Sequence, residues 1–396
     1  MSKRAISWSK GDLALTILTV VIFSLLIVVV VFAPHFLRSS YNSENADTHV
    51  EDVVSEPEEP LFVVSHIDTP ESVKALYMTA CVAGTPSWRD SLKTLIEDTE
   101  LNAVVIDIKD YTGVLSYGDN ITNFTKGCVV SDLKEFIGTL HDSNIYVIGR
   151  ISVFQDSLYT SVYPDLAVKK VSDGSVWKDF KGLTFVDVGA TPYWKYIVDI
   201  SHKAYDLGFD ELNYDYVRYP SDGNMKDANF TWTVGTTTRQ VMLESFFKYL
   251  HDELQSLGAK LSVDLFGMTT TVTSDLGIGQ VLERALPYFD YVAPMVYPSH
   301  YPPNWNGFPN PAEYPYEVIK IAMQSAVDRE MVWRETNGLA TTTPSKLRPW
   351  IQDFNLGAQY GPDKVRAQIQ ATYDLGLSSW MLWNAGNRYT REALLD

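Results

Sequence analysis

The sequence predicts an α/β protein of the (β/α)8 barrel class, preceded by a single N-terminal transmembrane helix. After residue 70, eight short apolar or β-branched runs alternate with segments of helical periodicity, and eight parallel strands close such a barrel. One apolar run near the N-terminus is long enough to cross a bilayer. An acidic segment without Lys or Arg lies between these two parts.

The N-terminal apolar run predicts a transmembrane helix at residues 13–34. Residues 13–32 carry only apolar and hydroxyl side chains, and about 20 such residues span a bilayer as a helix. A cleaved signal peptide would have a shorter core of about 7–15 residues followed by small residues at its cleavage site.

The charges beside this run predict its orientation. Three basic residues precede the run and one follows it closely, namely Lys3, Arg4, Lys10 and Arg38. Positive charge collects on the cytoplasmic side, so residues 1–12 should be cytoplasmic and the chain after Pro34 extracellular. We therefore expect a single-pass protein of the cell membrane. Residues 35–70 are rich in acidic side chains and are expected to form a disordered linker.

The domain at residues 71–396 carries the eight predicted strands. They begin at Ala75, Ala103, Ile145, Glu211, Lys260, Asp290, Leu347 and Ser379. The seventh is the least regular, because Pro349 cannot donate a hydrogen bond within a central strand.

Helix signals separate the strands. One helix should start near Pro192 and end at Gly208, and the last should run from Pro362 to Gly376. Residues 335–345 show no clear pattern, and residues 156–184 form an expected insertion after the third strand.

Composition excludes several classes of function. The net charge of −17 repels polyanions, so we expect no nucleic-acid partner. The sequence contains no HExxH, Walker, G-x-S-x-G or dinucleotide-binding motif, and we expect neither a metal nor a cofactor. The two cysteines, Cys81 and Cys128, favour ordinary buried thiols over a single bridge.

Polar residues at the ends of the predicted strands are the candidates for chemistry, because barrel enzymes place their sites there. By strand alternation, Asp107 and Lys109 should share one face. Buried carboxylates at one barrel mouth should either form a structural ion-pair network or perform acid and base work. The candidates are Asp107, Lys109, Arg150, Asn213, Asp215, Arg218, Asp264 and Asn384.

Aromatic rings after the strands favour sugar binding over a purely structural network, although for any one ring taken alone plain packing is favoured over sugar binding. These rings are Trp88, Tyr219, Tyr297, Tyr301, Trp305 and Trp383. We assign Tyr297 and Trp383 to substrate binding.

Six segments in chain order resemble the bacterial glycoside hydrolase family DUF4015. They are DIKDYTG, GRISVFQD, FDELNYDYVRYPSDG, PMVYPSHY, RPWIQDF and SSWMLWNAGN, within about residues 74–390. The resemblance implies a TIM barrel related to α-amylase-like and other retaining glycosidases, whose nucleophile is often an Asp at the end of the fourth strand. That residue corresponds to Asp215 here, and Asp264 best matches the acid. The segment FVDVGATPYW departs from the expected pattern, which leaves the contacts after the third strand open.

We therefore expect a membrane-anchored glycoside hydrolase that acts on a cell-surface or extracellular polysaccharide. Asp215 and Asp264 would be the catalytic carboxylate pair. Substrate contacts would come from Asp107, Lys109, Arg150, Asn213, Arg218, Tyr297, Trp383 and Asn384. The main alternative is a carbohydrate-binding or cell-wall scaffold barrel without catalysis. A metal-dependent deacetylase is a weaker alternative, because the His residues are scattered.

Overall fold

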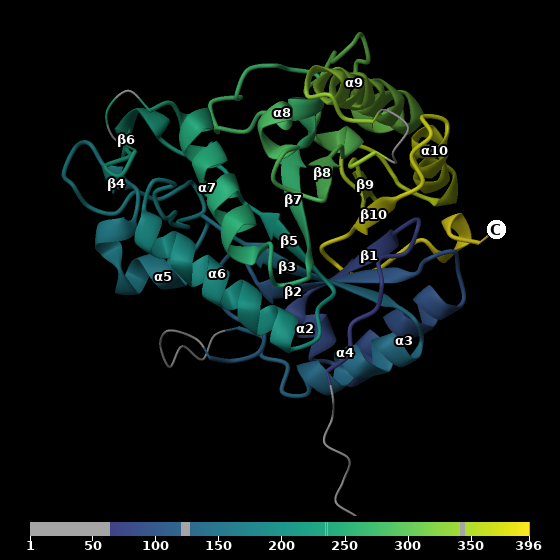
Figure 1. The fold of residues 1–396 in the computed structure, drawn as a ribbon. Helices are drawn as coiled ribbons and strands as arrows, with labels where there is room; N and C mark the ends of the chain where they lie inside the picture. The colour runs from purple at the N-terminus through teal and green to yellow at the C-terminus, as the bar shows by residue number, and fades with distance from the viewer. Residues whose placement is uncertain (1–63, 120–126, 234, 236, 341–344, 396) are drawn as a thin grey trace, which may run out of the picture. The chain divides into compact units, whose positions relative to one another are not determined.

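Eight parallel strands close into a barrel surrounded by helices, which confirms the predicted fold class (Figure 1). The computed structural model describes residues 64–119, 127–233, 235, 237–340 and 345–395. The barrel strands are β1 (Lys74–Met78), β2 (Ala103–Lys109), β3 (Tyr146–Ser152), β5 (Glu211–Asp215), β7 (Lys260–Phe266), β8 (Tyr291–Met295), β9 (Trp350–Gln352) and β10 (Trp380–Trp383). Their order around the barrel is β1-β10-β9-β8-β7-β5-β3-β2.

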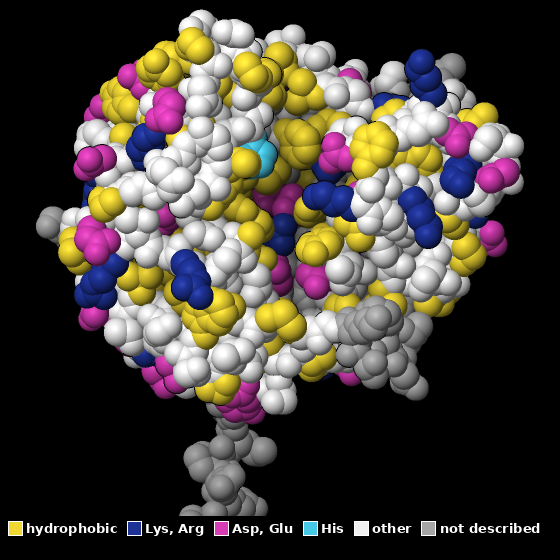
Figure 2. Space-filling model, turned by 180° about the vertical axis from the view of Figure 1, so that it is seen from behind, with side chains coloured by type: hydrophobic (Ala, Val, Ile, Leu, Met, Phe, Trp, Pro, Cys, Tyr) yellow, Lys and Arg dark blue, Asp and Glu magenta, His cyan; other side chains and the backbone are white. Residues whose placement is uncertain are grey.

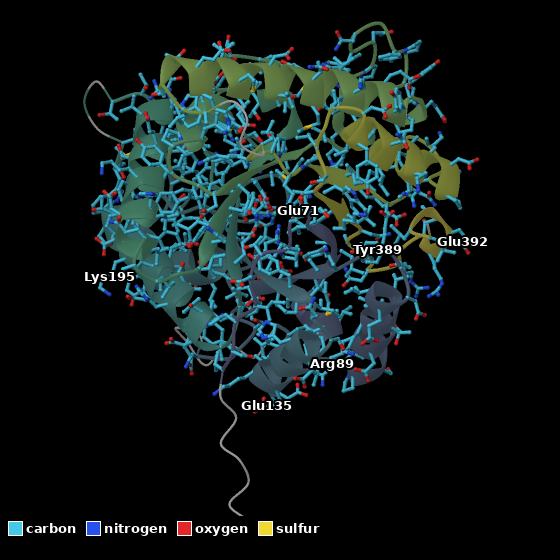
Figure 3. All side chains as sticks on the ribbon, turned by 45° about the vertical axis from the view of Figure 1, so that its right-hand side comes forward. Glu71, Arg89, Glu135, Lys195, Tyr389 and Glu392 are labelled. Atoms are coloured by element: carbon cyan, nitrogen blue, oxygen red, sulfur yellow. A yellow bond between two sulfur atoms is a disulfide. The ribbon has the colours of Figure 1, made fainter. Side chains whose placement is uncertain are left out.

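Helices connect these strands on the outside. They are α2 (Ala80–Ala83), α3 (Pro86–Glu97), α4 (Leu133–Asp142), α5 (Ser157–Val162), α6 (Thr191–Asp206), α7 (Arg239–Leu254), α8 (Leu282–Ala285), α9 (Pro315–Thr336) and α10 (Pro362–Tyr373). Short 3-10 helices cover Pro164–Leu166, Met225–Asp227, Gly267–Thr270, Pro298–His300, Pro311–Glu313 and Arg391–Ala393. Charged side chains of the outer helices, such as Lys195 on α6 and Glu135 on α4, point away from the barrel (Figure 3).

The side chains of each strand alternate between two apolar layers, as the period of two requires. Val105, Ile148 and Met381 belong to the inner cluster that fills the barrel. Val104 and Val147, one position away on β2 and β3, belong to the larger cluster packed under the helices. Both faces of the strands are thus buried, which explains why the sequence shows near-continuous apolar runs.

The predicted helix starts and the insertion are confirmed, and the two helices end two and three residues before the predicted glycines. Pro192 lies in the first turn of α6, and Gly208 follows that helix with a φ of +109°. The insertion after β3 contains α5 and the short strand β4 (Lys169–Lys170), which pairs with β6 (Ala228–Asn229). The seventh strand is shorter than predicted because β9 starts only after Pro349.

The predicted linker is too long at its C-terminal end, because residues 64–70 pack against the barrel. The backbone N–H of Ile67 donates to Asp210 Oδ1 at 2.9 Å, and the Ile67 side chain packs on the inner apolar cluster. Thr69 Oγ1 lies 3.0 Å from the hydroxyl of Tyr146. Asp210 and Tyr146 stand at the starts of β5 and β3, so this segment covers the N-terminal end of the barrel.

The predicted cytoplasmic residues 1–12, the transmembrane helix at 13–34 and the linker up to residue 63 lie outside the described residues. Within the part of the chain that the structure describes, no helix is both long and apolar enough to cross a membrane.

The two cysteines are not free thiols, which corrects the sequence-based expectation. Cys81 in α2 and Cys128, which precedes α4, form a disulfide. The two residues are 47 positions apart, so their proximity depends on the tertiary packing of the chain. The sequence has no local signal for that approach.

Candidate active site

Arg150 at the C-terminal end of β3 links two carboxylates of the neighbouring strands. Its Nη1 donates to Asp107 Oδ1 at 2.7 Å on β2, and its Nη2 donates to Asp215 Oδ2 on β5. Its Nε lies 4.0 Å from Asp264 Oδ2 on β7. Burial alone would lower the pKa of Arg150, but Asp215 and Asp107 raise it well above its ordinary value. A permanent positive charge therefore stands between three carboxyl groups.

Asp215 is held by one charged and one backbone donor. Besides the Arg150 contact, its Oδ1 accepts a hydrogen bond from the backbone N–H of Tyr216 at 2.5 Å. Tyr216 has a φ of +52°, a left-handed conformation that is uncommon for a non-glycine residue and often marks functional sites. This turn directly after β5 presents the Asp215 carboxylate to the barrel mouth.

Asp264 has one occupied and one open carboxyl oxygen. Its Oδ1 accepts hydrogen bonds from Asn213 Nδ2 at 2.9 Å and from Trp350 Nε1 at 2.8 Å. For Oδ2, no donor among the described residues lies within hydrogen-bonding distance. Burial and repulsion by Asp215 raise the pKa of Asp264 well above its ordinary value, despite the opposing effect of Arg150. Folding therefore shifts Asp264 toward its protonated form, and Oδ2 is free to carry the proton.

Asp215 and Asp264 line one pocket of about 350 Å³ at the C-terminal ends of the strands. Figure 2 shows a hollow near the centre of one face, where acidic and basic side chains lie among hydrophobic ones. Six residues predicted for the site line this pocket: Arg150, Asp215, Arg218, Asp264, Tyr297 and Trp383. The structure thus brings together the proposed catalytic pair and four of the proposed substrate contacts.

Asp107 and Asn213 lie behind the lining residues and position them. Asp107 accepts a hydrogen bond from the hydroxyl of Tyr77 at 2.5 Å in addition to its Arg150 contact, so both of its oxygens are occupied. Asn213 donates to Ser262 Oγ at 3.1 Å as well as to Asp264.

Lys109 does not share a face with Asp107, which corrects the predicted substrate contact. The register with β3 shifts between the two residues, so that Asp107 pairs with Arg150 and Lys109 pairs with Ile151. This β-bulge breaks the alternation of two and turns Lys109 toward the helices. There its Nζ is fully buried, 2.8 Å from Asp156 Oδ2.

Asn384 organises the loop after β10 instead of facing the pocket. Its Nδ2 donates to the carbonyl oxygens of Asp353 and Arg388, and its Oδ1 accepts from the backbone N–H of Gly386 at 2.8 Å. With all of these groups engaged, Asn384 contributes to the site only through the shape of this loop.

Sequence reasoning missed pocket residues on β7, β8 and β9 and on the segments that follow β7 and β8. They include Trp350, Phe266, Met268, Met295 and His300. Trp350 is the first residue of β9, so the strand-end signal that identified Trp383 at the end of β10 did not apply to it. Conversely, Tyr219 is a core residue, since its ring is fully buried and packs edge-on against Phe230.

In the ranges that the structure describes, no three His, Cys, Asp or Glu side chains are grouped to hold a metal ion. A larger hollow of about 770 Å³ lies along α9, away from the strand ends. Its principal charged pair, Arg329 with Glu283, is already engaged in mutual hydrogen bonds at 2.6 and 2.7 Å. The pocket at the barrel mouth therefore remains the candidate site.

Trp383 forms an aromatic wall of this pocket. Its ring stacks on Tyr77 with centroids 4.1 Å apart, and the Arg150 guanidinium lies 5.1 Å from its ring centroid. One face is therefore packed, and the ring is still partly exposed to the pocket.

Trp383→Ala should weaken glycan binding more than it destabilises the fold, because the ring is only partly buried. The measurements are glycan affinity by calorimetry and the melting temperature (Tm). The control is Trp88→Ala, which removes a partly exposed indole outside the pocket. A large fall in Tm with unchanged affinity would assign Trp383 to the core.

Comparison with known proteins agrees with this geometry. Residues 75–389 match the family DUF4015, described as "Putative glycosyl hydrolase domain". The glycoside hydrolase domain of PgaB (BpsB) from Bordetella bronchiseptica superposes with a TM-score of 0.58 at 12% identity, covering 82% of this chain and 99% of that chain. The C-terminal domain of a putative chitinase from Desulfitobacterium hafniense DCB-2 gives 0.51 at 14% identity, with 82% and 97% covered. At such identities, the likeness shows a shared fold.

A hypothetical protein from Ruminiclostridium thermocellum ATCC 27405 is 33% identical, covering 48% of this chain and 96% of that chain, with a TM-score of 0.42. No protein of curated function matches this chain.

Proposed function

The chain belongs to the DUF4015 family of glycosyl hydrolase domains, and from its pocket we propose that it hydrolyses a cell-surface or extracellular polysaccharide through Asp215 and Asp264. One observation carries the proposal: two neighbouring carboxyl groups line one pocket and have different surroundings. Arg150 and a backbone N–H hold Asp215, whereas burial and the Asp215 charge raise the pKa of Asp264 well above its ordinary value. Such divergent environments separate an acid from a charged partner.

These two environments match what glycosidic cleavage requires. As the bond from the anomeric carbon to the leaving oxygen breaks, Asp264 gives its proton to that oxygen. The Asp215 carboxylate attacks or stabilises the positively charged anomeric carbon. Water then supplies a hydroxyl group to the sugar and returns a proton, so both carboxyl groups recover their initial states.

The test is turnover on a panel of purified cell-wall and extracellular polysaccharides, followed as new reducing ends. An enzyme should produce new reducing ends from at least one member. A polysaccharide that binds at the pocket but stays intact through prolonged incubation would instead identify the non-catalytic carbohydrate-binding barrel.

We also propose that the barrel is displayed outside the cell on the segment at 13–34. The sequence of that segment supports an anchor, and the Cys81–Cys128 disulfide fits an oxidising compartment.

Protease added to intact protoplasts should therefore remove the barrel, while a cytoplasmic marker protein stays whole. The measurement is an immunoblot of the barrel before and after treatment. Protection of the barrel until the membrane is permeabilised would reverse the proposed orientation.

A further inference from the structure

Arg218 lies in the pocket without a carboxylate partner. It follows Asp215 by three residues, lines the same cavity as Asp215 and Asp264, and is only 5% exposed. No described carboxylate oxygen lies within 4.0 Å of its guanidinium. Such a buried, unpaired charge is costly unless a ligand supplies the missing partner.

The other buried cations show that this situation is unusual within the barrel. Among the residues that the structure describes, five Lys or Arg side chains are buried. Four of them have a carboxylate within ion-pair distance: Lys109 with Asp156, Arg150 with Asp107 and Asp215, Arg334 with Glu330, and Arg348 with Glu211. Arg218 is the exception, and it is one of the two that line the pocket.

The surroundings of Arg218 hold the guanidinium in place and leave part of it available. Its Nη1 donates to the carbonyl oxygen of Tyr219 at 3.0 Å and to Ser221 Oγ at 3.3 Å. The rings of Phe266 and Tyr216 flank it, with centroids 4.8 and 5.4 Å from its Cζ. Its Nε and Nη2 have no hydrogen-bond acceptor among the described residues. The Nε and Nη2 groups are therefore positioned to donate paired hydrogen bonds to a bound group.

We propose that Arg218 binds an anionic substituent of the sugar chain, so that the preferred substrate is an acidic glycan. The inference rests on the proposed function for the identity of the ligand as a glycan. A planar carboxylate or a tetrahedral sulfate ester would each offer two oxygens that the paired N–H donors of a guanidinium can bind. Burial lowers the pKa of Arg218, since nearby acidic groups offset the lost hydration only in part. An anion bound beside the guanidinium would offset the rest of its lost hydration.

The test measures binding of matched acidic and neutral probes to the purified full chain by calorimetry. The carboxylate probes are oligogalacturonate and oligomannuronate, each compared with its carboxyl-reduced form. The sulfate probe is keratan sulfate, whose repeating unit has no uronic acid, compared with its desulfated form. We expect at least one acidic probe to bind about ten-fold tighter than its neutral partner, with a preference that weakens as salt is added. Which pair shows the preference distinguishes carboxylate from sulfate.

Three variants locate the preference. Arg218→Gln should weaken binding of the preferred acidic probe by about ten- to a hundred-fold and leave the neutral probe nearly unchanged. Arg218→Lys keeps the charge but loses the paired N–H donors, so its affinity for the acidic probe should lie between those of the native chain and Arg218→Gln. Lys226→Gln removes an exposed cation from the same loop and should keep the full preference. If Arg218→Gln does not fold, the preference of the native chain and the Arg218→Lys result decide the question.

Equal binding of acidic and neutral partners, a panel in which no acidic probe binds, or a preference that survives in Arg218→Gln would each overturn the inference. Reducing ends are measured on the same probes. Cleavage of neutral glycans that is independent of Arg218 would overturn the inference and leave the proposed hydrolase intact. Arg218-dependent binding of acidic glycans without cleavage would support the inference and overturn the proposed hydrolase.

Discussion

Replacing Asp215 with Asn should lower turnover by at least about a thousand-fold while the barrel stays folded, because a charge that acts in the transition state is lost with little change in shape. Arg150 keeps its second partner, Asp107, in this variant. Loss of the neighbouring negative charge should also lower the pKa of Asp264, since repulsion by Asp215 contributes to raising it. Steady-state kinetics on a verified substrate and NMR titration of Asp264 measure the two effects.

Asp222→Asn is the matched control, because Asp222 is an exposed carboxylate on the same loop after β5 and does not line the pocket. Its activity should equal that of the native chain. If Asp215→Asn turns over substrate at the native rate, the assignment of Asp215 and the mechanism built on it are wrong.

Replacing Asp264 with Asn should greatly reduce cleavage of natural glycans and spare substrates with good leaving groups, which need little protonation. Because Asp264 must be protonated to act as the acid, native activity should fall as the pH rises through its raised pKa. That fall should be absent in Asp264→Asn. The Oδ1 contacts with Asn213 and Trp350 can persist, since the amide oxygen of Asn also accepts hydrogen bonds.

Thermal stability gives an independent check with a defined sign. A carboxyl group whose pKa is raised by folding stabilises the native chain most at low pH, and this contribution is lost as the pH rises through the raised pKa. The Tm of Asp264→Asn relative to that of the native chain should therefore increase with pH. An equal loss of activity on activated and natural substrates would place the acid elsewhere. Asp107 would be a poor substitute, because Arg150 and Tyr77 occupy both of its oxygens.

The fold was predictable because a parallel barrel buries both faces of its strands, so that strands such as β2 and β3 appear as apolar runs. The same logic located Arg150, Asp215 and Asp264, because the strand ends share one rim of the barrel. It failed at Lys109, where a bulge in β2 breaks the alternation without any change in residue type. The Cys81–Cys128 bridge was also missed, because it depends on a contact between segments distant in sequence.

The division of roles within the pocket could not be predicted from the sequence. Arg150 and Arg218 are both arginines at strand ends, and only their surroundings distinguish them. The Nη1 and Nη2 groups of Arg150 donate to Asp107 and Asp215, whereas Arg218 donates to protein acceptors only through its Nη1 among the described residues. Hydrogen-bond partners are set by tertiary packing, which a pattern of residue types does not encode.

The segment at 64–70 lies against the end of the barrel that is opposite the pocket. Its contacts lie with Asp210 and Tyr146, at the ends of the strands where the chain enters the sheet. The pocket opens at the other ends of the same strands. Residue 64 therefore lies at the end of the barrel opposite the pocket, so that an attachment made there would leave the mouth unobstructed.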